Sequence, residues 1–372
     1  MRNDRPASLP YVRCIAWIVV LGVFVTATVP ATASAQERRV VVVPGLEAGD
    51  LAALTDRGAV GLLVPDAGPR TSGARARAAL ERGAVRNSVL GGLPEGEARL
   101  NVETAGAVPS GPAIVLGLPT GGEQPNKRRY PIAVLGEGYR GVLTSDSTRI
   151  PGLVSIVDVA PTALGEDGAL GSSADDDPLG TLEDLDERIE ANRDAKTVVL
   201  LLSLALIVAV ATFFPAGVLP AFAGVLLANL ALGAIAPTEA WIDALVLVCT
   251  VAAALLLARA GPVVHGFLMA GVLGAYLVAM AVDERWVALS PLGPTQNSRF
   301  YGLSNLLATL LLVPALAGAV LLWRRFGIWA FAGVAALSPV TVGGSSFGAV
   351  GGRAIVLLVA FLVLAALELG FD

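Results

Sequence analysis

The sequence predicts an α/β domain with a mostly parallel sheet, followed by an all-α bundle of about seven membrane-spanning helices. Two observations predict the bundle. Hydrophobic residues make up 55% of the 372-residue chain and charged residues only 15%, and most charged residues precede position 197. Multi-span membrane proteins have this composition, whereas soluble domains seldom do. A third observation predicts the domain, because short β-branched runs alternate with helical stretches between residues 36 and 180.

The first 35 residues are typical of a secretory signal peptide. Basic residues precede the apolar stretch CIAWIVVLGVFVTATV, and the small residues Ala33, Ser34 and Ala35 follow it. This order predicts cleavage after Ala35, and an uncleaved N-terminal anchor helix is the alternative. Both interpretations place residues 36–196 on the extracytoplasmic side of the membrane.

Periodicity predicts the elements of the α/β domain, which we assign to residues 36–180. Apolar runs predict strands at 38–43, 59–64, 113–117, 131–136 and 153–157, and helices are predicted at 49–58 and 73–83. The acidic, Gly- and Ser-rich stretch 166–180 predicts a surface loop. Residues 181–196 predict a connecting helix with Thr181 as its N-cap and with Leu182, Leu185 and Ile189 on one face.

Residues 197–372 form the predicted transmembrane domain. Seven apolar stretches of roughly 20 residues, the length that crosses a bilayer, lie at 197–213, 217–235, 241–258, 262–282, 301–322, 327–342 and 351–369. From an extracytoplasmic start, the loops that contain Arg259, Arg324 and Arg325 face the cytoplasm, as the positive-inside rule requires. We therefore predict a multi-pass protein of a bacterial inner membrane, in contact with the lipid bilayer.

The segment PIAVLGEGYRGVLTSDSTRIPGLVSIVDVAPTAL (131–164) resembles the closing segment of the alkaline phosphatase/sulfatase superfamily. In that superfamily a strand and a Gly-containing loop precede a strand that ends in an Asp-x-x-Pro-Thr helix start. The resemblance implies an alkaline-phosphatase-like fold, two divalent metals and a Ser or Thr nucleophile at a helix start. The residues alone favour a simpler role for Asp158, as the cap of a helix with Pro161 in its first turn.

Few positions match the chemistry that this resemblance implies. Thr71 and Ser72 stand where the nucleophile belongs, although hydroxyls at helix starts are also common caps. Glu47 and Asp50 are displaced from the expected metal ligand after the first strand, and Asp158 is the remaining candidate ligand. Residues 36–196 contain no histidine. We interpret the domain as a non-catalytic member without a cofactor; under the alternative interpretation, carboxylates alone would hold a divalent metal.

The membrane half has one marked polar segment, SPLGPTQNSRFYGLSNLLATLL (290–311). It places Arg299, Tyr301 and Asn305 at the external end of the fifth predicted span. These residues either anchor the span at the interface or form a ligand site. The segment resembles an RFYG-x-x-N pattern of bacterial multi-pass proteins that also carry a phosphatase-like external domain, and this resemblance implies no activity.

Three functions follow from these patterns. The first is ligand binding or scaffolding in the bacterial envelope, with other envelope proteins or a phosphorylated or lipid-linked ligand as partner. The second is a membrane phospho- or phosphoethanolamine-type transferase with an altered metal site. The third is a transporter or lipid-handling protein. The net charge of −5 and the lack of a dense Lys/Arg cluster exclude a nucleic-acid partner.

Overall fold

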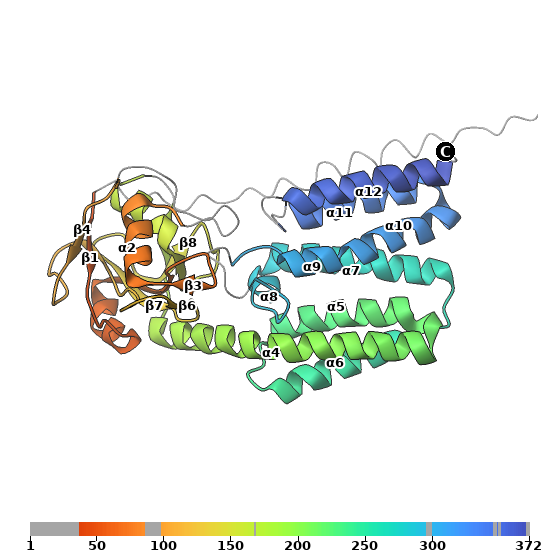
Figure 1. Cartoon of the computed structure of the whole chain (residues 1–372), viewed down its shortest axis with the longest axis horizontal. Helices are drawn as coiled ribbons and strands as arrows, with labels where there is room; N and C mark the ends of the chain where they lie inside the picture. Colours follow the sequence, from red (N-terminus) through yellow and green to blue (C-terminus); the bar gives the residue numbers. More distant parts are fainter. Residues whose placement is uncertain are drawn as a thin grey trace, which may run out of the picture. The chain divides into compact units, whose positions relative to one another are not determined.

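The computed structural model describes residues 37–85, 98–166, 169–294, 300–344, 348 and 351–369 of the chain. All of them belong to the second of the chain's two units, Gln36–Asp372. The predicted signal segment 1–35 lies outside the described residues. Within the second unit an α/β region is followed by a helical region (Figure 1).

The α/β region contains a mixed, mostly parallel sheet. Its strands, in the order along the sheet, are β10 (Leu170–Ser173), β8 (Gly141–Ser145), β2 (Gly58–Val64), β7 (Tyr130–Leu135), β5 (Ala113–Leu116), β1 (Arg39–Val42) and β4 (Val102–Thr104), and β9 (Leu153–Ser155) also pairs with β2. Among these strands β7 and β10 run against their neighbours. A separate two-stranded sheet joins β3 (Arg70–Thr71) to β6 (Gln124–Pro125).

Both faces of the sheet are buried, as the unbroken apolar strands predict. One face packs against α2 (Gly73–Arg82) and α3 (Val159–Ala163). The other face packs against the 3₁₀ helix η1 (Ala48–Arg57) and the first half of α4 (Pro178–Phe213), whose contacts are Leu182, Leu185 and Ile189. The predicted apolar face of the connecting helix is therefore confirmed. A short 3₁₀ turn, η2 (Ile156–Asp158), leads from β9 into α3.

The structure corrects two local predictions in this region. The stretch 166–180 is not only a surface loop, because it contains β10, which pairs antiparallel with β8. Backbone pairing with a neighbouring strand overrides the weak strand propensity of the sequence LGSS. Thr181 is not the helix cap, since α4 begins three residues earlier and Asp177 Oδ1 accepts a hydrogen bond from the Gly180 amide at 3.1 Å.

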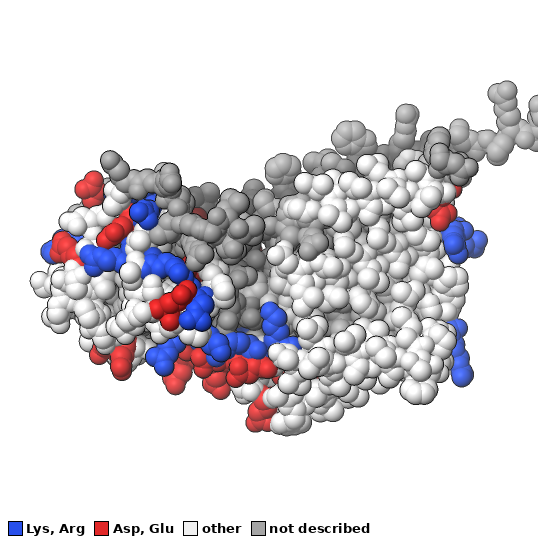
Figure 2. Space-filling view, viewed as in Figure 1, with Lys and Arg blue, Asp and Glu red and all other residues white. Residues whose placement is uncertain are grey.

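The connecting helix and the first predicted span are one continuous helix, α4, of 36 residues. The remaining elements of the helical region are η3 (Pro215–Gly217), α5 (Val218–Ile235), α6 (Ala240–Leu255), α7 (Pro262–Val282), α8 (Arg285–Ala288), α9 (Asn305–Leu310), α10 (Leu312–Phe326), α11 (Ile328–Gly343) and α12 (Gly351–Leu369). On the face shown in Figure 2, acidic and basic side chains gather over the sheet and the start of α4, and the surface of the later helices is mostly uncharged.

Four helices, not seven, are long and apolar enough to cross a membrane among the described residues. They are Pro178–Phe213, Pro215–Ile235, Pro262–Val282 and Asn305–Phe326. Three shorter apolar helices, Ala240–Leu255, Ile328–Gly343 and Ala354–Glu368, coincide with the other predicted spans. The sequence pattern therefore locates the apolar segments correctly, and three of the helices that they form are short for a membrane span.

A buried segment joins α7 to the residues before α9. Residues 287–294 are all buried, although they lie between the fourth and fifth predicted spans. Asn229 on α5 holds this segment: its Nδ2 donates to Ser290 Oγ at 3.0 Å, and its Oδ1 accepts from the Leu292 amide at 2.9 Å. The same Nδ2 donates to Tyr276 Oη on α7 at 3.1 Å. Protein groups thus satisfy the polar groups of this buried segment.

Candidate functional site

Several parallel strands end at one edge of the sheet, and the polar candidates follow these ends. Strands β1, β2, β5, β8 and β9 run in the same direction, so their carboxyl ends share this edge. Open α/β sheets bind ligands at the carboxyl ends of their strands.

The edge carries a pocket of about 970 Å³ between the loops after β1 and β5, the start of β7 and the first half of α4. This volume lies within the range of about 300–1,000 Å³ that is usual for ligand sites. The lining carries five carboxylates and two guanidinium groups, which belong to Glu47, Glu183, Asp186, Glu187, Glu190, Arg128 and Arg129. The excess of carboxylates makes the pocket electronegative.

Arg129 is the most buried of these charged groups, with a side chain that is 5% exposed. Its Nε donates to Asp186 Oδ1, and its Nη2 lies 3.3 Å from Glu190 Oε1. These ion pairs join the start of β7 to α4 and neutralise part of the lining. Glu183 and Glu187 are exposed and form no ion pair or hydrogen bond with the described residues, so they leave uncompensated negative charge at the pocket.

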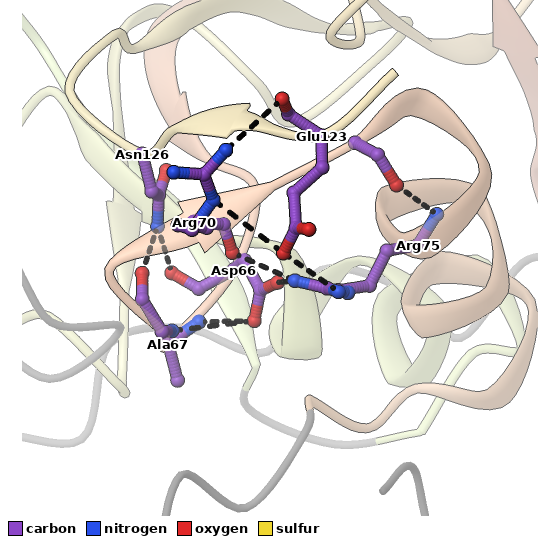
Figure 3. A network of polar contacts seen from close by, with 8 residues as sticks. Asp66, Ala67, Arg70, Arg75, Glu123 and Asn126 are labelled. Carbon is purple, nitrogen blue, oxygen red and sulfur yellow. Dashed lines mark hydrogen bonds and ion pairs between the residues drawn. The ribbon is translucent and has the colours of Figure 1, made fainter.

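A second polar network surrounds the start of α2 (Figure 3). Ser72 caps this helix, because its Oγ accepts a hydrogen bond from the Arg75 amide at 3.2 Å. The Arg75 guanidinium donates to the Arg70 carbonyl oxygen at 3.0 Å and to Glu123 Oε1 at 3.3 Å. The helix cap, which was the simpler interpretation of Ser72, is confirmed.

Asp66 lies at the centre of this network, just after β2 (Figure 3). It is 1% exposed, and its Oδ1 accepts hydrogen bonds from the Ala67 and Gly68 amides at 2.7 and 3.3 Å. Its Oδ2 makes no hydrogen bond and lies 3.9 Å from Arg75 Nη1. The long ion pair therefore supplies the charge that offsets this buried oxygen.

Asn126 and Thr71 complete the network. Asn126 Nδ2 donates to the carbonyl oxygens of Asp66 and Gly68, at 2.7 and 2.9 Å. Thr71 is 1% exposed, and its Oγ1 has no hydrogen-bond partner among the described residues. A buried hydroxyl is a poor nucleophile for a substrate that arrives from solvent, whereas Ser72 is only half-buried.

Asp158 lies at the same edge, beyond β9, and its side chain does not cap a helix. Its Oδ2 accepts hydrogen bonds from Ser145 Oγ and from the Ser147 amide at 3.1 Å, and its Oδ1 accepts from Ser147 Oγ at 2.7 Å. The cap interpretation was therefore wrong. The physical reason is that the pairing of β8 with β2 brings Ser145 beside the carboxylate, so the side chain satisfies a neighbouring turn instead of its own helix.

Glu47 and Asp50 are joined to each other at the start of η1. Asp50 Oδ2 accepts a hydrogen bond from the Glu47 amide at 2.8 Å, and the two residues form a capping box. Glu47 lines the large pocket, whereas Asp50 lines a neighbouring hollow of about 590 Å³. No group of three or more His, Cys, Asp or Glu residues that could hold a metal ion occurs in the described part of the chain.

The marked segment of the membrane half contacts the α/β region. Phe300 is 2% exposed and packs in the same core as Leu153 and Leu182. The guanidinium of Arg149, in the turn between β8 and β9, lies 4.1 Å from the centre of the Tyr301 ring and 3.5 Å from Glu284 Oε1. The structure thus brings Tyr301 to the junction between the two regions.

The structure describes only one of the other two candidates of this segment. Arg299 lies outside the described residues. Asn305 is the first residue of α9, and its side chain is exposed. Ser304 caps this helix through a hydrogen bond from the Leu307 amide to its Oγ at 3.0 Å. The ligand-site interpretation of this segment therefore stays a prediction.

Sequence reasoning missed the charged residues that shape this edge, namely Asp66, Arg75, Glu123, Arg129 and Asp186. One of them had a usable signal, since Asp66 follows the predicted strand 59–64 by one proline. The others come from a helix, a loop and the connecting helix, and only the tertiary structure brings them together.

Comparison with known proteins identifies no relative. No family model matches the chain, and neither a curated protein nor a solved structure matches it. The resemblance to the alkaline phosphatase/sulfatase superfamily therefore stays a prediction from the residues 131–164. The fold and the site described above are the findings on which a functional proposal rests.

Proposed function

We propose that the chain is a multi-pass protein of the bacterial inner membrane whose extracytoplasmic α/β domain binds a cationic ligand without transforming it. The observation that carries the proposal is the electronegative pocket at the carboxyl ends of the strands, with five carboxylates in its lining. A cleft with one sign of charge and low-dielectric walls concentrates ligands of the opposite sign. Basic envelope peptides and polyamines have the required chemistry.

Several features support the membrane placement. Four of the described helices have the length and composition of spans; one shorter apolar helix, Ala240–Leu255, lies between two of them, and two more, Ile328–Gly343 and Ala354–Glu368, follow the last. We propose that the shorter helices also cross, because this gives seven spans and places Arg259, Arg324 and Arg325 in cytoplasmic loops. The α/β domain, which precedes the first span, is then extracytoplasmic.

The lining favours a cationic ligand over the phosphorylated ligand that the sequence also suggested. Arg129 is engaged by Asp186 and Glu190 and is therefore already neutralised. Only Arg128 remains as a further cation in the lining, against three other carboxylates. A phosphate group in this pocket would face mostly like charge, which costs free energy in a partly desolvated site.

The proposal is tested with the full-length chain in nanodiscs of neutral phosphatidylcholine. A fluorescein-labelled hexalysine peptide is the probe, and its binding is followed by anisotropy. We expect hexalysine to bind and hexaglutamate and inorganic phosphate to leave the anisotropy unchanged. Preferential binding of hexaglutamate or phosphate would contradict the proposal.

A charge-matched pair of variants locates the binding. Glu183→Gln with Glu187→Gln removes two lining carboxylates, whereas Asp184→Asn with Asp194→Asn removes two exposed carboxylates of the same helix that do not line the pocket. An exposed charge pair contributes about 0.5 kcal/mol. The first variant should weaken hexalysine binding roughly fivefold, and the control less than twofold. Equal weakening of hexalysine binding by the two variants would mean that the peptide binds the overall negative charge of α4 and not the pocket.

One observation keeps the transferase as a second candidate. Ser72 is half-buried at the start of α2, so its hydroxyl is accessible to a substrate that arrives from solvent, as a nucleophile would need. Phosphate release from p-nitrophenyl phosphate by the full-length chain, with and without Mg²⁺, tests this candidate. Activity that Ser72→Ala abolishes would favour the transferase over the binding protein.

A further inference from the structure

We propose that the helical region binds an anionic phospholipid in a groove between α5, α10 and α12, with the lipid phosphate at Arg324. The groove has a volume of about 640 Å³, and its lining is apolar except for Arg324. The apolar lining comes from all three helices and includes Leu219 of α5, Val320 of α10 and Leu364 of α12. This inference goes beyond the proposed pocket in the α/β domain and uses only the membrane placement of the helices.

The arrangement of the groove matches the two parts of a lipid. Arg324 lies in the last turn of α10, next to the loop that the membrane placement assigns to the cytoplasm. Leu316, Ala317 and Val320 line the groove from the preceding turns of the same helix, deeper in the bilayer. A phosphate at Arg324 would therefore direct an acyl chain along the apolar wall.

The charge of Arg324 selects the occupant. Its guanidinium makes no ion pair or hydrogen bond within the described part of the chain, and it is exposed. A guanidinium forms strong bidentate hydrogen bonds with a phosphate group. Another apolar helix would fill the groove without providing a partner for this charge, and the chain's own apolar segment 14–29 contains no acidic residue. An anionic phospholipid supplies both the apolar surface and the charge.

The helix offers two matched controls. Arg325 is the next residue and carries the same charge, but it does not line the groove. Val313 lies on α10 two turns before Val320, is 39% exposed and does not line the groove either. The substitutions Arg324→Gln and Val320→Trp thus change the groove, whereas Arg325→Gln and Val313→Trp make the same changes beside it.

Native mass spectrometry of the full-length chain in detergent tests the proposal. Dioleoyl-phosphatidylglycerol and dioleoyl-phosphatidylcholine are titrated separately, and the one-lipid complex is quantified. We expect the unsubstituted chain to prefer phosphatidylglycerol by about tenfold, because the choline cation offsets the phosphate charge that Arg324 recognises. Arg324→Gln should abolish this preference, and Arg325→Gln should retain it. Val320→Trp should weaken binding of both lipids, whereas Val313→Trp should not.

Three results would overturn the proposal. The first is equal binding of the two lipids by the unsubstituted chain. The second is an equal loss of preference in Arg324→Gln and Arg325→Gln, which would indicate a diffuse charge effect. The third is a two-chain complex that Val320→Trp dissociates, which would assign the groove to a second copy of the chain. Since lipid binding is measured without the hexalysine probe, its outcome is independent of the pocket in the α/β domain.

Discussion

Asn229 is predicted to hold the buried segment 287–294 in the helical region. Asn229→Ala removes its hydrogen bonds to Tyr276 and Ser290 and leaves the buried Leu292 amide without an acceptor. Side-chain hydrogen bonds between membrane helices contribute about 0.6 kcal/mol each. An unpaired buried amide costs about 1–3 kcal/mol more. The free energy of unfolding should therefore fall by roughly 2–4 kcal/mol.

The assay is thermal unfolding of the full-length chain in detergent, followed by tryptophan fluorescence. At roughly 2 °C for each kcal/mol, Asn229→Ala should lower the Tm by about 4–8 °C. The matched control is Asn305→Ala, because the side chain of Asn305 is exposed and makes no hydrogen bond within the described residues. It should lower the Tm by less than about 1 °C. Equal Tm shifts in the two variants would refute the assigned role of Asn229.

Three further predictions use the same unfolding assay. Asp158→Ala should lower the free energy of unfolding by about 3–5 kcal/mol, because it removes a buried acceptor of three hydrogen bonds and leaves the O–H of the buried Ser145 without an acceptor. An unchanged Tm would contradict this role. Gly233→Ala should lower the free energy of unfolding by about 1–3 kcal/mol, because its new Cβ would lie 1.7 Å from a backbone carbonyl oxygen. A new Cβ at the control Gly271→Ala would meet no atom within 4 Å, so this variant should lower the free energy of unfolding by less. Burial raises the pKa of Glu284 above its usual 4.5, so the folded state binds the proton more tightly than the unfolded state does. The free energy of unfolding should therefore fall as the pH rises from the unfolded-state pKa of Glu284 to its higher folded-state pKa. Glu284→Gln should flatten this pH dependence. If the variant kept the pH dependence of the unsubstituted chain, the assignment to Glu284 would be wrong.

The sequence predicts those elements whose hydrophobic pattern is strong. Strands β2 and β5 are continuous apolar runs, and burial on both faces requires this pattern. The apolar spacing of Leu182, Leu185 and Ile189 gives the correct buried face of α4 for the same reason. The strand β10 escapes prediction, because the sequence LGSS has weak strand propensity and depends on its pairing with β8.

The candidate site was less predictable, because its contacts join residues far apart in the sequence. Ser72 as a helix cap needs only local information, and the structure confirms this role. The role of Asp158 depends on Ser145 and Ser147, which only the arrangement of β8 and β9 brings near. The pocket likewise combines Arg129 with acidic residues of α4 that lie more than fifty positions later. Periodicity carries no information about such pairings.

We propose that the chain crosses the membrane with its α/β domain on the extracytoplasmic side. The most direct measurement is labelling of single cysteines by a membrane-impermeant maleimide in intact spheroplasts. The chain first receives Cys14→Ala and Cys249→Ala, and then either Asp184→Cys, at an exposed position in the first half of α4, or Arg325→Cys, at the end of α10. We expect the cysteine at position 184 to be labelled in intact spheroplasts and the cysteine at position 325 to be labelled only after lysis. Labelling of position 325 in intact spheroplasts, with position 184 protected until lysis, would contradict this proposal.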